Sequence, residues 1–135
     1  MILEVEEEFY VGEDTFFDSV TPARSHGVVF EDDLSTGYFY AIGKLPGQEI
    51  LDALHIYNVA DVTDKAIPCN IKIAWTNDWQ FASLLINNYC HAIFDFKNKT
   101  GYSRNAFPPS SGKWKTDNER TVLTDELIDE LLMGK

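Results

Sequence analysis

Residues 79–96 read WQFASLLINNYCHAIFDF and give the strongest fold signal in the sequence. Two runs of β-forming residues flank the pair Asn87-Asn88, and Asn tolerates the positive φ that a two-residue hairpin turn requires. We therefore predict two antiparallel strands joined by a turn at Asn87-Asn88 or at Asn88-Tyr89.

Side-chain alternation gives this hairpin two faces, because successive strand residues point to opposite sides. With either turn, the face that we expect to be the core carries Trp79, Phe81, Ser83, Leu85, Cys90, Ala92, Phe94 and Phe96. The other face carries Gln80, Ala82, Leu84, Ile86, His91, Ile93 and Asp95. This second face is too apolar to be left in water, so a helix, a second sheet or another subunit should cover it.

Other segments also favour strands. Residues 1–10 read as an acidic edge strand, residues 27–42 as a second hairpin, and residues 67–75 as a strand with alternating isoleucines. The periodicity of residues 50–59 fits a helix or a strand, and we favour a strand for its second half. A turn is predicted at residues 45–47, where Pro46 precedes Gly47.

The C-terminal third is more polar. We predict an ordered loop over residues 97–120, anchored by Phe107 and Trp114, and a helix over residues 124–133 that Thr124 caps. The apolar stripe of this helix could cover the second face of the hairpin. The predicted fold class is mainly β (α+β by count of elements): one domain, residues 1–135, forming an antiparallel bent sheet or sandwich of about six to eight strands with one C-terminal helix.

The charge of the 135-residue chain is strongly negative, −11 at pH 7, and unevenly spread. Residues 1–33 hold ten acidic residues against Arg24, a net charge of −9, which leaves −2 for the other 102 residues. Such a charge repels phosphate backbones and anionic bilayers, so we expect no nucleic-acid or membrane partner. The acidic quarter is either a solvated face that aids solubility or a surface that meets a basic protein.

The two cysteines, Cys69 and Cys90, are expected to be small buried residues with reduced thiols. Because the chain shows no basic region followed by an apolar stretch at its N-terminus, we predict a cytoplasmic protein. The Cys and His spacings fit no zinc site, and we predict neither metal nor cofactor. Hydrolase and nucleotide-binding signatures are also missing from the sequence.

The candidate ligand-binding residues are His55, Tyr57, His91, Asp95 and Arg104. His91 and Asp95 share a strand face but lie roughly 13 Å apart, so each needs a partner from another segment. A His, Asp and Arg set could bind an anion or act in acid–base chemistry. Alternatively, Asp95 has a structural role in which it holds the loop at residues 102–104.

A second set of candidates could contact a partner protein: Glu31, Asp32, Asp33, Tyr38 and Tyr40. The first three offer oxygen ligands, but their spacing does not match a calcium-binding loop. We therefore interpret them as a solvated turn with side-chain hydrogen bonds to the backbone, next to two strand tyrosines.

Several segments resemble a bacterial family of small proteins that is catalogued only as a domain of unknown function. They are GYFYAIG at residues 37–43, ILDALHIYNV at 50–59, HAIFDF at 91–96, GYSR at 101–104 and FPP at 107–109. The similarity extends from about Val11 to Trp114, which leaves out the first ten residues and the C-terminal helix. It implies a bacterial, cytoplasmic, single-domain protein and brings no activity, cofactor or catalytic residue.

Three functional hypotheses follow. The first is a non-enzymatic binding or protein-interaction domain, such as an immunity-like inhibitor of a basic partner. The second is a small-molecule-binding protein or modest enzyme with a pocket on the sheet face. The third is a homodimer, or other homo-oligomer, that buries the apolar second face of the hairpin.

Overall fold

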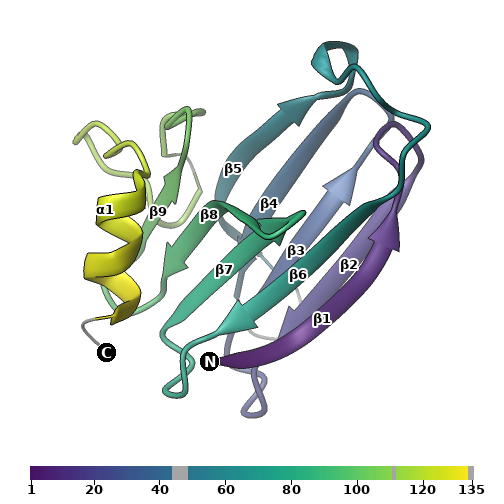
Figure 1. Ribbon diagram of the computed structural model, residues 1–135. Helices are drawn as coiled ribbons and strands as arrows, with labels where there is room; N and C mark the ends of the chain where they lie inside the picture. Colours follow the sequence, from purple (N-terminus) through teal and green to yellow (C-terminus); the bar gives the residue numbers. More distant parts are fainter. Residues whose placement is uncertain (44–48, 111, 134–135) are drawn as a thin grey trace.

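The structure is a computed structural model that describes residues 1–43, 49–110 and 112–133. The turn predicted at residues 45–47 lies outside these ranges. The described chain forms nine strands in two antiparallel sheets that pack face to face, with one short helix near the C-terminus (Figure 1). The predicted fold class, a mainly antiparallel β structure with one C-terminal helix, is confirmed.

The first sheet has five strands in the order β1-β6-β7-β8-β9. Their bounds are Ile2–Phe9 for β1, Cys69–Trp75 for β6, Phe81–Ile86 for β7, Tyr89–Asp95 for β8 and Thr100–Ser103 for β9. The acidic strand β1 lies at one edge and pairs with β6 alone.

The second sheet has four strands in sequence order. Their bounds are Thr15–Val20 for β2, Gly27–Asp32 for β3, Thr36–Ile42 for β4 and Ile50–Asn58 for β5. The predicted second hairpin is β3–β4, and the ambiguous segment at residues 50–59 is a strand from its first residue to Asn58. A 3₁₀ turn, Val59–Asp61, follows β5.

The β7–β8 turn lies at Asn87-Asn88, the first of the two predicted positions. Both residues have positive φ, 52° and 65°, and the turn joins Ile86 to its partner Tyr89. Asn87 also accepts a hydrogen bond on Oδ1 from the backbone N–H of Asn70, 2.9 Å away. Its side chain therefore ties the turn to β6.

The predicted faces of this hairpin are wrong because β8 contains a β-bulge. The pairing moves from Leu85↔Cys90 to Leu84↔Ala92, which leaves His91 without an opposite residue. One extra residue reverses the alternation of everything beyond it. The face that points into the sandwich therefore combines residues that simple alternation assigns to opposite faces: Ala82, Leu84, Ile86, Ala92 and Phe94.

The main core lies between the two sheets. From the four-stranded sheet it receives Phe30, Phe39 and Leu54, none of which has measurable exposure, and Phe39 stacks on Phe94 of β8 with ring centroids 5.1 Å apart. Trp75 of β6 is also fully buried and donates its indole N–H to Ser19 Oγ at 2.9 Å. Both sheets thus share one core.

A second, smaller core lies on the outer side of β7 and β8. The helix α1, Asp125–Ile128, continues into a π-helical turn, Asp129–Met133, and Thr124 caps it by accepting a hydrogen bond from the N–H of Leu127. Leu123 and the helix pack on Phe81 and Ile93. The helix therefore covers the outer face of the hairpin, at the left of Figure 1.

The segment at residues 97–120 differs from the predicted loop in two respects. It contains β9, a four-residue strand that pairs with β8. The sequence does not indicate this strand, because it contains a glycine and is flanked by turn residues. Trp114 is 7% exposed and anchors the segment, as predicted. Phe107 is 52% exposed, so the prediction that it anchors the segment is wrong.

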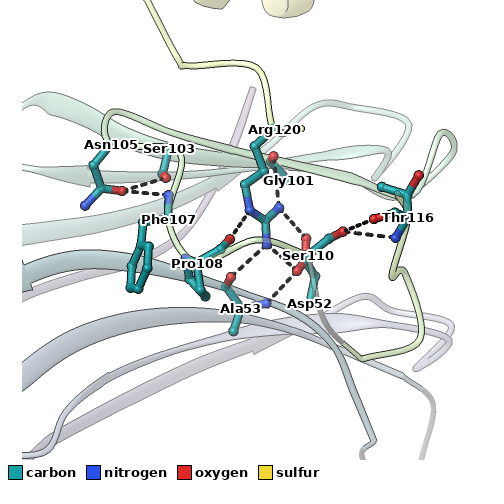
Figure 2. Close-up of polar contacts among 10 residues, drawn as sticks. All are labelled: Asp52, Ala53, Gly101, Ser103, Asn105, Phe107, Pro108, Ser110, Thr116 and Arg120. Atoms are coloured by element: carbon teal, nitrogen blue, oxygen red, sulfur yellow. Dashed lines mark hydrogen bonds and ion pairs between the residues drawn. The ribbon is translucent and has the colours of Figure 1, made fainter. Parts of the chain in front are cut away.

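A buried ion pair holds this segment to the sandwich (Figure 2). Arg120 donates from Nη2 to Asp52 Oδ1 at 2.6 Å and from Nη1 to Oδ2 at 2.8 Å, and both side chains are at most 4% exposed. The remaining guanidinium donors reach the backbone carbonyls of Ala53, Gly101 and Pro108. Each charge is thus neutralised and hydrogen-bonded, as buried ions require.

Candidate functional site

The outer face of the four-stranded sheet points away from the core. The strand register aligns Phe16, Glu31, Tyr38 and His55 in one row across β2, β3, β4 and β5. A parallel row contains Asp18, Val29, Tyr40 and Ala53. Together with Asp33 in the β3–β4 turn, these rows form what we call the aromatic–acidic face, defined by Phe16, Asp18, Glu31, Asp33, Tyr38 and Tyr40.

Aromatic rings on this side of the sheet form a strip that starts at the tyrosine pair. Tyr38 and Tyr40 stack with ring centroids 5.7 Å apart, and Tyr38 meets His55 edge-on at 5.5 Å. The strip continues to Phe107, whose ring lies 6.0 Å from that of His55. At the opposite side, on β2, Phe16 is 61% exposed. Large aromatic side chains therefore reach solvent on both sides of the tyrosine pair.

Backbone hydrogen bonds favour the ionised form of one carboxylate of the face, that of Asp33. Asp33 Oδ1 accepts hydrogen bonds from the backbone N–H groups of Thr36 and Ser35, which lower its pKa. Burial, with Glu31 as the second cause, raises the pKa of Tyr40. Over the described part of the chain, Asp18, Glu31 and Asp33 form no ion pair.

Asp32, the fifth residue predicted to contact a partner, does not lie on this surface. It is 0% exposed, and its Oδ2 accepts hydrogen bonds from Gly12 N at 2.7 Å and from Tyr57 Oη at 2.6 Å. Leu34 N donates to Oδ1 at 2.8 Å. Alternation along β3 explains the difference, because Asp32 points to the opposite side from Glu31. Asp32 instead fixes the entry to β2 and the β3–β4 turn.

The predicted ligand-binding residues are only partly brought together. His55, His91 and Arg104 line a cavity of about 320 Å³ with Ile56, Tyr89 and Asn105. Tyr57 lies elsewhere, bonded to Asp32, and burial together with that hydrogen bond raises its pKa far above the usual range.

Asp95 is also distant from this cavity and has a structural role. It is 1% exposed and accepts hydrogen bonds from the backbone N–H groups of Lys97 and Asn98 and from the side chain of Gln80. Asp95 therefore holds the turn between β8 and β9, rather than the loop at residues 102–104.

The polar groups around the small cavity are largely engaged with one another. His55 binds Asn58 Oδ1 through Nε2 at 2.9 Å and Asn105 Nδ2 through Nδ1 at 2.8 Å. Arg104 donates to the Cys90 carbonyl at 2.9 Å and pairs with Asp125 at 2.9 Å.

His91 also lines this cavity. Burial, with the Arg104 guanidinium as the second cause, lowers the pKa of His91 to about 4, so the imidazole is neutral at pH 7. His55, His91 and Arg104 thus share this cavity, but Asp95, the acidic member of the set that the sequence suggested, does not line it.

Sequence reasoning missed Phe16 and Asp18 because it did not predict β2. Their signal is the alternation in TFFDSV, in which Phe17 and Ser19 face inward. It also missed the Asp52–Arg120 pair. An aspartate among inward-facing positions of an apolar strand predicts a cationic partner, but not which one.

Several general features bear on function. Within residues 1–43, 49–110 and 112–133, no helix is long and apolar enough to cross a bilayer. The same residues contain no group of three or more His, Cys, Asp or Glu side chains placed to hold a metal ion. Cys69 and Cys90 are free.

Comparison with known proteins identifies relatives but no activity. Residues 9–132 match the family described as "Uncharacterized protein conserved in bacteria (DUF2251)". A curated relative from Haemophilus influenzae, named "Uncharacterized protein", is 38% identical over 108 residues, which cover 78% of this chain and 67% of the relative. No solved structure matches the chain.

The family match confirms the resemblance found in the sequence and corrects its extent. The C-terminal helix, which the resemblance left out, falls inside the matched residues 9–132, whereas most of strand β1 falls outside them. Because the match covers most of the chain, this protein belongs to the bacterial family DUF2251.

Proposed function

We propose that this protein is a non-enzymatic interaction domain that binds a basic protein through the aromatic–acidic face, in the manner of an immunity-like inhibitor. The observation that carries the proposal is the stacked Tyr38–Tyr40 pair with Asp18, Glu31 and Asp33 around it. Two half-buried tyrosines and the exposed Phe16, beside carboxylates that form no ion pair among the residues described, favour recognition of arginine and lysine side chains.

Each part of the face has a distinct role in this proposal. The carboxylates steer a basic partner toward the face and make association depend on salt. The tyrosines and Phe16 supply apolar area at a small entropic cost, and cationic side chains can stack on their rings. The sheet beneath keeps these groups in place before binding.

The same face is poorly suited to a homodimer. A two-fold interface would bring Asp18, Glu31 and Asp33 of one copy close to the same carboxylates of the other, without a described cation between them. The alternative of a small-molecule pocket on the sheet face also has less support, because His55 and Arg104 already bind Asn58, Asn105 and Asp125.

A charge-reversal pair tests the proposal. The variant D18K/E31K changes the face, and the matched control E4K/E7K makes the same change of net charge on β1, where both glutamates are exposed. Each protein is immobilised and exposed to extract from the source bacterium at low salt, and retained proteins are identified by mass spectrometry.

The proposal predicts that the original protein and the β1 control retain the same basic protein, which salt elutes and which D18K/E31K does not retain. Equal retention by all three proteins would place the contact elsewhere. A failure to retain any basic protein at low salt would refute the proposed function.

A further inference from the structure

The loops at one end of the sandwich border an open cleft that lies apart from the aromatic–acidic face. Its volume is about 780 Å³, within the range of small-molecule sites. The β2–β3, β6–β7 and β8–β9 loops meet at this end (Figure 1), and Trp114 also lines the cleft. The lining residues used below are His26, Trp79, Phe96, Lys97, Lys99, Lys113 and Trp114.

Aromatic rings form the base of the cleft. Phe96 lies 4.3 Å from His26 and 5.1 Å from Trp114, measured between ring centroids, and it also packs on Trp75 at 5.6 Å. Trp114 is 7% exposed and Trp75 is 0% exposed, so the rings beneath the cleft are fixed by the core. Such a base provides flat apolar surfaces on which another ring can stack.

The position of Trp79 depends on a backbone conformation that bulky residues rarely adopt. Its φ is 61°, in the left-handed region, and the surrounding loop holds it there. Trp79 N donates to the Thr76 carbonyl at 2.9 Å, and the Trp79 carbonyl lies 2.9 Å from His26 Nε2. The other ring nitrogen of His26 contacts Ser25 Oγ at 2.9 Å. This arrangement presents the indole of Trp79 at the cleft.

Basic residues lie around the aromatic base. Lys97, Lys99 and Lys113 are three of only eleven basic residues in a chain with twenty-two acidic ones. In the described chain, only Lys113 of these forms an ion pair, an exposed contact of 3.6 Å with Glu49. The cleft also contains Asp78, so its lysines outnumber its two carboxylates in a protein of charge −11.

We propose that this cleft binds a small anion that carries a flat ring. The ring stacks on Trp79 and Phe96, above the buried Trp114, and the phosphate or carboxylate group of the ligand contacts the lysines. The site is independent of the aromatic–acidic face, because its lining shares no residue with that face. Both parts of the ligand are needed, since exposed lysines alone hold anions weakly in water.

Two probes separate the possible anionic groups: AMP for a phosphate and indole-3-acetate for a carboxylate. Binding is followed by quenching of tryptophan fluorescence and by ligand-observed NMR. At least one probe should bind with a Kd below about 1 mM. Adenosine lacks the phosphate of AMP and ribose 5-phosphate lacks its ring system, so each should bind at least about tenfold more weakly than AMP. Indole, which lacks the carboxylate, should likewise bind at least about tenfold more weakly than indole-3-acetate.

The variant K97Q/K99Q should weaken binding of the successful probe by about tenfold or more. The control K65Q/K115Q makes the same change of net charge outside the cleft and should leave the Kd unchanged. D18K/E31K should also bind the probe normally, which separates this test from that of the proposed function.

Two results would overturn the proposal. One is that neither AMP nor indole-3-acetate binds with a Kd below about 1 mM, the affinity that a built site should reach. The other is that K97Q/K99Q binds the probe as tightly as K65Q/K115Q does. Because Lys97 and Lys99 are exposed, these substitutions should not prevent folding.

Discussion

Arg120 joins several parts of the chain through the hydrogen bonds of one side chain. It lies in a segment without regular structure. Two nitrogens of its guanidinium bind the Asp52 carboxylate, and the guanidinium also donates hydrogen bonds to three backbone carbonyls (Figure 2). Gly101 makes room for this contact, because a Cβ there would lie 2.8 Å from Asp52 Oδ2. The pair therefore joins three distant segments, β5, β9 and the loop before the helix.

Replacing Arg120 with methionine should lower the free energy of unfolding by about 3–5 kcal/mol, because it leaves the Asp52 carboxylate buried without a counter-ion. Chemical denaturation measures this change. The double variant D52L/R120M removes both charges and should recover much of the loss. A single variant within about 0.5 kcal/mol of the original protein would show that the pair is not structurally important.

His91 predicts how stability depends on pH. The unfolded chain binds the imidazole proton with a pKa of about 6.5, whereas the folded protein binds it only near pH 4. Between these values the unfolded state holds more protons, so the free energy of unfolding should fall as the pH falls from 6.5 toward 4, by at most about 1.4 kcal/mol per pH unit.

The variant H91N lacks this titration and should lose less stability over that range, as denaturation at pH 7 and pH 5 would show. Other groups titrate equally in both proteins, so the difference between the two slopes isolates His91. Parallel slopes would contradict the assigned cause.

Among the elements, the β7–β8 hairpin shows what sequence can and cannot predict. Its turn is local, and two consecutive asparagines between β-forming runs indicate it directly. The bulge at His91 depends on the register in which β7 and β8 pair. The alternation of side chains along one strand does not indicate that register. The turn could therefore be predicted, while the assignment of faces could not.

The turn itself gives a prediction about backbone strain. Replacing Asn88, whose φ is 65°, with valine should lower the free energy of unfolding by about 1–2 kcal/mol, because β-branched residues disfavour the left-handed region. Thermal or chemical denaturation measures the effect.

The variant N88G serves as the control for side-chain loss, because both substitutions remove the 2.9 Å contact between Lys72 Nζ and Asn88 Oδ1. It should stay within about 0.5 kcal/mol of the original protein or exceed it. If N88G were as unstable as N88V, the hydrogen bond, and not the conformation, would be the cause.

For the aromatic–acidic face, too, the sequence indicates the local grouping of residues but not the long-range pairing. Tyr38, Tyr40 and Glu31 could be grouped from sequence because they flank one predicted turn. Phe16 and Asp18 join them only through the β2–β3 pairing, and His55 joins through β5. Long-range pairing of this kind leaves no local signal in one sequence.

At the scale of the molecule, the core lies between two sheets, and the strands of one sheet come both before and after those of the other in the chain. Strands β1 and β6 to β9 form one sheet around an intervening block of four strands, and Phe39 of that block stacks on Phe94. Neither sheet buries its inner face without the other. The chain should therefore unfold as one unit.

Unfolding followed by far-ultraviolet circular dichroism should coincide with unfolding followed by tryptophan fluorescence. The first reports on both sheets, while Trp75, Trp79 and Trp114 report on one end of the sandwich. Coincident transitions are expected for a single core. Separate midpoints would mean that the loop end, or one sheet, unfolds independently.

The two candidate sites occupy different parts of the molecule, one on an outer sheet face and one among the loops at an end. At the first of these sites, we propose, the aromatic–acidic face contacts a basic protein. Its charge, its stacked tyrosines and its exposed Phe16 all lie on one side of the four-stranded sheet.

Site-specific photo-cross-linking in the source bacterium tests this claim most directly. A photoreactive benzoylphenylalanine replaces Phe16, which is 61% exposed on the face, or as a control Leu3, which is 51% exposed on β1. We expect an adduct with a basic protein from position 16 and not from position 3. No adduct at position 16, an adduct with a second copy of this chain, or equal adducts from both positions would contradict it.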